Sequence, residues 1–180
     1  MKKLLIFCVM LIMMSSCIEH ARIYLKLTDE DAAAIPYRLD QTVDFLDQNG
    51  DTLTYKVTCD ETYPYDHDRY HYSSKTTIYD EYYCYARTVI LECEKTGKRL
   101  GFTIRPEKEL AFYLDNEFDL YGSLLTNGPS TIDGIDYEHV HHQILYDSNT
   151  GELIYNWYYN EEYGLIYIKY YDQLLQLLNN

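Results

Sequence analysis

The sequence predicts a mainly β protein with a single curved antiparallel sheet, built as a half-barrel or a sandwich, and one short N-terminal helix. Three observations lead to this prediction. Short segments alternate apolar and polar residues with the period of two that is typical of strands. Turn sequences such as Asn49-Gly50 separate these segments. The chain is also rich in tyrosine, a residue that favours strands, with 22 copies against a single tryptophan.

The first elements can be assigned from local pattern. Residues 22–27 alternate apolar and polar side chains, which predicts a short strand. Thr28 then precedes three acidic residues and the apolar run 32–35, a pattern that predicts a capped helix of one or two turns with its acids at the positive end. Pro36 ends this helix, because the residue before a proline avoids the helical conformation.

Most of the remaining chain is predicted to form strands joined by turns. Asn-Gly between the alternating segments 42–46 and 53–57 indicates a hairpin. Residues 85–91 are apolar on both faces, which favours a curved sheet over a flat one with one solvated face. Further strands are expected over residues 79–93, 100–104, 110–114, 137–146, 153–159 and 165–171.

No low-complexity linker and no repeat divides the chain. We therefore expect one antiparallel β domain over residues 22–180. A domain of this length buries about 70% of its unfolded surface, which is enough for a stable core.

Residues 1–16 have the pattern of an export signal. Lys2 and Lys3 precede an uninterrupted apolar run over residues 4–14, which is too short to span a bilayer. Met14-Ser15-Ser16-Cys17 resembles a bacterial lipobox, in which the signal is cleaved before a cysteine that then carries lipid. Two alternatives are an ordinary cysteine after a conventional cleavage site and a retained membrane helix.

The lipobox resemblance implies a location. It predicts a lipid anchor on Cys17, a short tether over residues 17–21 and attachment to a membrane through acyl chains, palmitate among them. Ile18 follows the cysteine, where an aspartate would imply retention at an inner membrane, so the outer membrane is favoured. Whether the domain faces the periplasm or the outside stays open.

The charge excludes one class of partner. The formal net charge is −14 and the isoelectric point is near 4.7. Nucleic-acid binding needs clustered lysine and arginine to neutralise phosphates. We therefore expect no nucleic-acid partner.

Three cysteines remain after the signal and the anchor: Cys59, Cys84 and Cys93. This odd number allows one disulfide and one thiol, or no disulfide at all. No Cys-x-x-Cys motif is present, and buried free cysteines are the favoured alternative.

Several segments of the chain resemble small uncharacterised bacterial envelope lipoproteins. The similar segments are Leu27-Thr28-Asp29-Glu30-Asp31 through Tyr37, Val43-Asp44-Phe45, Asn49-Gly50-Asp51, Gly134 to Val140 and Tyr158 to Ile166. Together these segments cover about a third of the chain. The resemblance implies an envelope protein with a curved antiparallel sheet, and it implies no activity.

The string Glu138-His139-Val140-His141-His142 is a candidate metal site. In one strand His139 and His141 project to the same face, about 7 Å apart, a spacing that allows both to bind one metal ion. The alternative is a surface strand that happens to carry histidines.

Two groups of aromatic residues are candidates for ligand binding. Residues 59–75 form a polar, tyrosine-rich excursion in which Tyr65, Tyr70 and Tyr72 offer rigid contact area, unless it is simply a solvated hairpin tip. Tyr155, Trp157 and Tyr159 share one strand face and suit a sugar ring or an apolar patch if that face is open. Ordinary cross-strand packing is the alternative for this second group.

No catalytic motif is present: the chain lacks G-x-S-x-G, H-E-x-x-H, a P-loop and a dinucleotide fingerprint. We expect a non-enzymatic protein with no cofactor, a lipid-anchored binding or structural module that recognises a protein or a glycan. The alternative is a carrier that shelters an acyl chain or another apolar ligand on the concave face of the sheet. A filled interior favours the first function, and an empty apolar concave face favours the second.

Overall fold

The computed structural model describes residues 22–73, 76–115, 118–123 and 128–178. The chain divides into two compact units, one of residues 1–25 and 65–84 and the other of residues 26–64 and 85–180. The larger unit contains the helix, the hydrophobic core and the candidate site. In the smaller unit β1 (Arg22–Leu25) pairs in parallel with the middle of β4, with Arg22 opposite Glu81 and Leu25 opposite Cys84.

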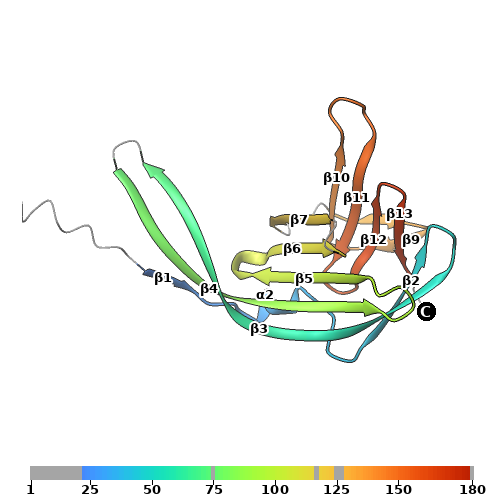
Figure 1. Ribbon diagram of the computed structural model, residues 1–180, viewed down its shortest axis with the longest axis horizontal. Coiled ribbons are helices and arrows are strands. Elements are labelled where there is room, and N and C mark those ends of the chain that lie inside the picture. Colours follow the sequence, from blue (N-terminus) through green and yellow to red (C-terminus); the bar gives the residue numbers. More distant parts are fainter. Residues whose placement is uncertain (1–21, 74–75, 116–117, 124–127, 179–180) are drawn as a thin grey trace, which may run out of the picture. The chain divides into compact units, whose positions relative to one another are not determined.

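The larger unit is a curled antiparallel sheet that forms a half-barrel, which confirms the predicted fold class (Figure 1). Its strands follow the order β10-β11-β12-β13-β2-β3-β4-β5-β6-β7, so the last strand, β13, lies beside β2 in the middle of the sheet. The bounds are β2 Thr42–Asp47, β3 Thr52–Ser73, β4 Thr76–Cys93, β5 Arg99–Arg105, β6 Glu109–Leu114, β7 Phe118–Ser123, β10 Val140–Tyr146, β11 Leu153–Asn160, β12 Gly164–Tyr170 and β13 Gln173–Leu177.

The predicted short helix is present, together with a small hairpin and a single helical turn. Helix α2 (Asp29–Ala33) begins with a capping box, in which Thr28 and Asp31 each accept a hydrogen bond from the other's backbone N–H. The two-residue turn Asp133-Gly134, both with positive φ, joins β8 (Ser130–Ile132) to β9 (Ile135–Tyr137). The single-turn η1 (Pro106–Lys108) separates β5 from β6.

The concave side of the half-barrel is filled by side chains. The core takes Phe45 and Tyr55 from the first hairpin, Phe102 and Phe112 from β5 and β6, and Trp157 from β11. Phe102 and Phe112 lie with ring centroids 5.1 Å apart, and Trp157 stacks on Phe112 at 6.0 Å with an interplanar angle of 5°. The interior is therefore a packed aromatic core.

Two buried tyrosine hydroxyls hold the segment after α2 against the distant strands. Tyr159 Oη donates to the carbonyl of Ala34 at 2.6 Å, and Tyr37 Oη accepts from the backbone N–H of Leu165 at 2.7 Å. Burial raises the pKa of both tyrosines. These hydrogen bonds satisfy backbone groups that would otherwise be buried without a partner.

The structure shows the state of the three remaining cysteines and the length of its helix. Cys59, Cys84 and Cys93 form no disulfide, and Cys84 and Cys93 are buried. Burial raises the pKa of the Cys59 thiol, with Glu61 and Asp60 adding to the effect. Within the described ranges, α2 is too short to cross a membrane and no other helix has the length and apolar character to do so.

Candidate functional site

Two residues of the predicted aromatic surface lie in the core. Trp157 and Tyr159 are 1% and 0% exposed, and Tyr155 is half-buried against the same cluster. The condition for a ligand on this face, an open surface, is not met at Trp157 and Tyr159. The sheet curls so that this face of β11 points inward. Trp157 and Tyr159 are therefore core residues, as the alternative of ordinary packing predicted.

The other three predicted tyrosines are all on β3. Tyr65 is half-buried, and the side chains of Tyr70 and Tyr72 lie outside the described residues, as does Cys17. The segment they belong to is strand, because β3 continues to Ser73 and β4 begins at Thr76.

The strand geometry that we expected for His139 and His141 is wrong. Strand β10 begins at Val140, and His139 precedes it with a positive φ of 53°. This left-handed residue breaks the alternation, so His139 is exposed and His141 is 3% exposed. In the part of the chain that the structure describes, no group of three or more His, Cys, Asp or Glu side chains is placed to hold a metal ion.

His139 nevertheless lies at a polar pocket, which we call the Lys108 pocket. Its volume is about 330 Å³. Its walls come from η1, from the residues just before β10 and from the end of β11 with the turn that follows. The lining residues are Lys108, Glu138, His139, Asn160, Glu161 and Glu162.

An ion pair between Lys108 and Glu161 is the centre of the pocket. Lys108 Nζ lies 3.1 and 3.0 Å from the two carboxylate oxygens of Glu161 and 3.2 Å from an oxygen of Glu30. The hydrogen bond to Glu161 is the largest influence and raises the pKa of Lys108. The ammonium therefore stays charged and neutralises part of the local negative charge.

The backbone holds Lys108 in an unusual conformation. Glu107 and Lys108 have φ of 64° and 54°, a left-handed region that costs an L-residue about 1–2 kcal/mol. The Lys108 N–H donates to the buried carboxylate of Asp31 at 3.1 Å, which fixes this turn against α2. Consecutive strained residues that the surroundings hold in place are a feature of functional sites.

His141 lies beside the pocket residue Glu161, and Asn160 is itself part of the pocket lining. His141 Nε2 lies 3.5 Å from Glu161 Oε1, and neither ring nitrogen has a hydrogen-bond partner among the described residues. Asn160 Oδ1 accepts from the backbone N–H groups of Glu162 and Tyr163, while its Nδ2 donates to the carbonyl of Glu138. Asn160 thus ties together two walls of the pocket.

The pocket offers hydrogen bonds and charge rather than apolar contact. Three carboxylates, one ammonium and one exposed imidazole line it. Lys108 contacts both oxygens of Glu161, and His141 is 3% exposed. The arrangement suits reversible binding of a small polar group.

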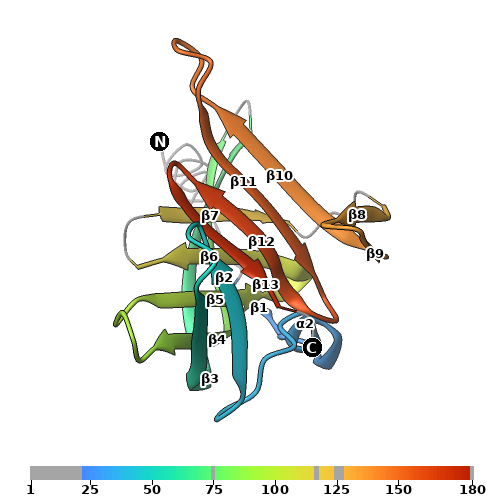
Figure 2. The same ribbon diagram turned by 90° about the vertical axis from the view of Figure 1, so that its right-hand side faces the viewer.

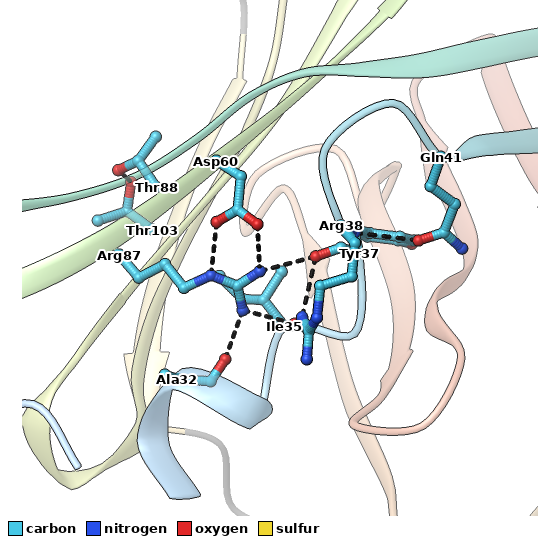
Figure 3. Close-up of polar contacts among 9 residues, drawn as sticks. All are labelled: Ala32, Ile35, Tyr37, Arg38, Gln41, Asp60, Arg87, Thr88 and Thr103. Atoms are coloured by element: carbon cyan, nitrogen blue, oxygen red, sulfur yellow. Dashed lines mark hydrogen bonds and ion pairs between the residues drawn. The ribbon is translucent and has the colours of Figure 1, made fainter. Parts of the chain in front are cut away.

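A second polar cluster surrounds Arg87 and is structural (Figure 3). The buried guanidinium donates to both oxygens of Asp60 at 2.7 and 2.9 Å. It also donates to the carbonyls of Ala32, Ile35 and Tyr37 at 2.6 to 2.8 Å. Since all three nitrogens are used within the chain, this arginine fastens the segment after α2 to the sheet and leaves no donor for a ligand.

No local sequence signal marks Lys108 and Glu161, which are 53 residues apart. Residues 106–109 look like an ordinary turn, and Glu161 belongs to a short polar turn between two strands. Only the curling of the sheet brings them together.

Comparison with known proteins identifies no family and no relative of this chain. No family model matches the chain, and neither the curated proteins nor the solved structures contain a match. The functional interpretation therefore depends on the residues themselves.

Proposed function

We propose that the chain is a lipid-anchored protein of the bacterial envelope, attached through Cys17 to the outer membrane. We further propose that it is a non-catalytic binding module that recognises a protein or a glycan. The filled half-barrel is the observation that supports this function, because a packed interior leaves ligand binding to the outer surface. The lipid anchor is supported by the lipobox-like sequence alone.

The Lys108 pocket is the surface that we assign to recognition. The carboxylates of Glu138 and Glu162 and the imidazole of His139, at a 330 Å³ pocket, match sugar hydroxyls or a polar side chain of a partner protein. Tyr163, which follows Glu162 directly and is 43% exposed, lines a second pocket together with Glu162.

The acyl-carrier alternative receives less support. It requires an open apolar concave face, and that face is occupied by the aromatic core. A cavity lined by Leu53, Tyr55 and Leu175 has a volume of about 120 Å³, below the roughly 300 Å³ at which ligand pockets usually begin.

Photo-cross-linking and a glycan array test the assigned surface. In cells, a photo-reactive amino acid at His139 should give a discrete adduct with a protein partner, whereas the same group at Asn149, exposed on the β10–β11 turn, should not. On an array, a glycan bound by the full chain should be lost in Glu138→Gln/Glu162→Gln and kept in Glu152→Gln. Equal results at both cross-linking positions, together with an array that shows no pocket-dependent binding, would contradict the proposal.

The anchor is tested separately by metabolic labelling with an alkyne-tagged palmitate. We expect the wild-type chain to be labelled and to sediment with outer membranes, and Cys17→Ala to be unlabelled and released. Equal labelling of both chains would show that Cys17 is not the lipidated residue.

A further inference from the structure

The distal end of β10 combines a sheet edge with exposed apolar residues. Strand β10 is the terminal strand of the sheet in the described part of the chain, and Figure 2 shows it on the outside of β11. Ile144, Leu145 and Tyr146 are 42%, 44% and 53% exposed. Because neighbouring strand residues point to opposite faces, these three consecutive residues make both faces of the strand end apolar.

Backbone hydrogen bonds define which groups lie at this edge. The Val140 N–H donates to Gly128, away from β11, and the Asp147 N–H donates to Glu152 on the β11 side. Antiparallel ladders alternate these directions residue by residue. The N–H and C=O groups of Ile144 and Tyr146 therefore point away from β11, towards the outside of the sheet.

This edge lacks the usual protection against pairing. Natural edge strands carry charged residues, prolines or bulges that block another strand. Residues 140–146 contain no Asp, Glu, Lys, Arg or Pro, although 24% of the chain is charged. The register shift of the β10–β11 ladder is an extra residue on β11, so β10 itself is unbroken.

We infer that two copies of this chain pair through the ends of their β10 strands, antiparallel and related by a two-fold axis at Leu145. In this register Leu145 faces Leu145 of the second copy, and Ile144 faces Tyr146 of the second copy. Each Ile144–Tyr146 pair exchanges both of its backbone hydrogen bonds. Each of the three exposed apolar residues then lies beside an apolar residue of the second copy.

The strand end is complementary to itself at this register, because the same apolar residues of the two copies meet. Asp147 lies opposite Gln143, so no acid faces another acid across the paired strands, although each chain carries a net charge of −14. A shift by one residue would place apolar side chains beside polar ones. The contact is smaller than a standard interface of about 1,200–2,000 Å², so the dimer is weak and depends on concentration. The inference does not rest on the proposed function.

Cysteine cross-linking of the full chain tests the register. A non-hydrogen-bonded antiparallel pair separates its Cα atoms by about 4.5 Å, within the range that a disulfide spans. In a Cys59→Ser background, mild oxidation should convert Leu145→Cys to a covalent dimer. Leu39→Cys, 57% exposed on another part of the surface, should stay at the level of the background chain.

Sedimentation of the full chain in detergent tests the edge independently. Ile144→Lys should abolish the concentration-dependent dimer, whereas Leu39→Lys should retain it. Added salt should increase the dimer fraction, because it screens repulsion between two acidic chains. Equal cross-linking of Leu145→Cys and Leu39→Cys, or a dimer that survives Ile144→Lys, overturns the inference. Dissociation of the dimer by added salt would also overturn the inference, and it would indicate a basic partner instead of a second acidic copy.

Discussion

Arg87 and Asp60 form a bidentate ion pair, with Nε and Nη2 of the arginine 2.7 and 2.9 Å from the two carboxylate oxygens. The arginine side chain is 8% exposed and the aspartate side chain 19% exposed, so solvent screens this pair weakly. The same guanidinium donates to three backbone carbonyls near α2. One buried cation therefore joins two strands and the N-terminal segment.

We expect Arg87→Met to destabilise the protein by about 3–5 kcal/mol, because it leaves a partly buried carboxylate and three carbonyls without their donor. The matched control is Arg99→Met, whose pair with Glu92 at 3.4 Å is largely exposed and contributes about 0–1 kcal/mol. Chemical unfolding followed by circular dichroism measures both. Equal losses in the two variants would show that the Arg87 cluster contributes no more than a surface pair.

Gly164 should tolerate no side chain. It has φ of +81°, and a Cβ there would overlap the buried hydroxyl of Tyr37. Gly151 has a similar φ of +73° but open space around it. We expect Gly151→Ala to cost about 1–2 kcal/mol from backbone strain alone, and Gly164→Ala to cost about 1–3 kcal/mol more from overpacking. Thermal unfolding distinguishes the two effects, and equal midpoints would contradict the predicted overlap.

Asp31 should make stability sensitive to acid. Burial raises the pKa of this carboxyl, but hydrogen bonds from Thr28 and from the Lys108 backbone outweigh burial and hold the pKa below its ordinary value of 3.8. A lowered pKa contributes stability that is present above pH 3.8 and is lost as the pH falls through the folded-state value. The unfolding free energy of the wild type should therefore decline more steeply below pH 3.8 than that of Asp31→Asn.

The control for this acid effect is Asp29→Asn, an exposed residue in the same helical turn. We expect its acid profile to parallel that of the wild type. At neutral pH Asp31→Asn should already be less stable by about 1–2 kcal/mol, because the capping box is lost. Parallel profiles for Asp31→Asn and the wild type would contradict the assignment.

Alkaline pH should unfold the protein through its buried tyrosines. Burial raises the pKa of Tyr37, Tyr55 and Tyr159 above the ordinary value of 10.0. A raised pKa contributes stability that is complete below pH 10.0 and is lost as the pH rises beyond it. Near-ultraviolet absorbance should show a late tyrosinate step that coincides with loss of circular dichroism. Smooth ionisation of every tyrosine in a folded chain would contradict this prediction.

The fold was predictable because its signals are local. The capping residues Thr28 and Asp31 are adjacent to the helix that they begin, and the turn at Asn49-Gly50 joins two strands that pair directly. Alternation within each strand is likewise a property of a few consecutive residues. These features do not depend on where distant parts of the chain lie.

The site was not predictable for the opposite reason. Trp157 and Tyr159 share a face as expected, but whether that face is open depends on how far the whole sheet curls. At His139 the strand pattern fails because this one residue adopts a left-handed conformation just before β10. Lys108 and Glu161 meet only through tertiary structure.

The hydrogen bonds of Tyr37 and Tyr159 constrain the order in which the protein folds. They join residues that are 128 and 125 positions apart, and β13 must enter the sheet beside β2. Contacts of such high contact order close late, because a long loop must first lose its freedom. The segment after α2 cannot complete its hydrogen bonds until the region around Leu165 is in place. The half-barrel therefore forms only when nearly the entire polypeptide is available to fold.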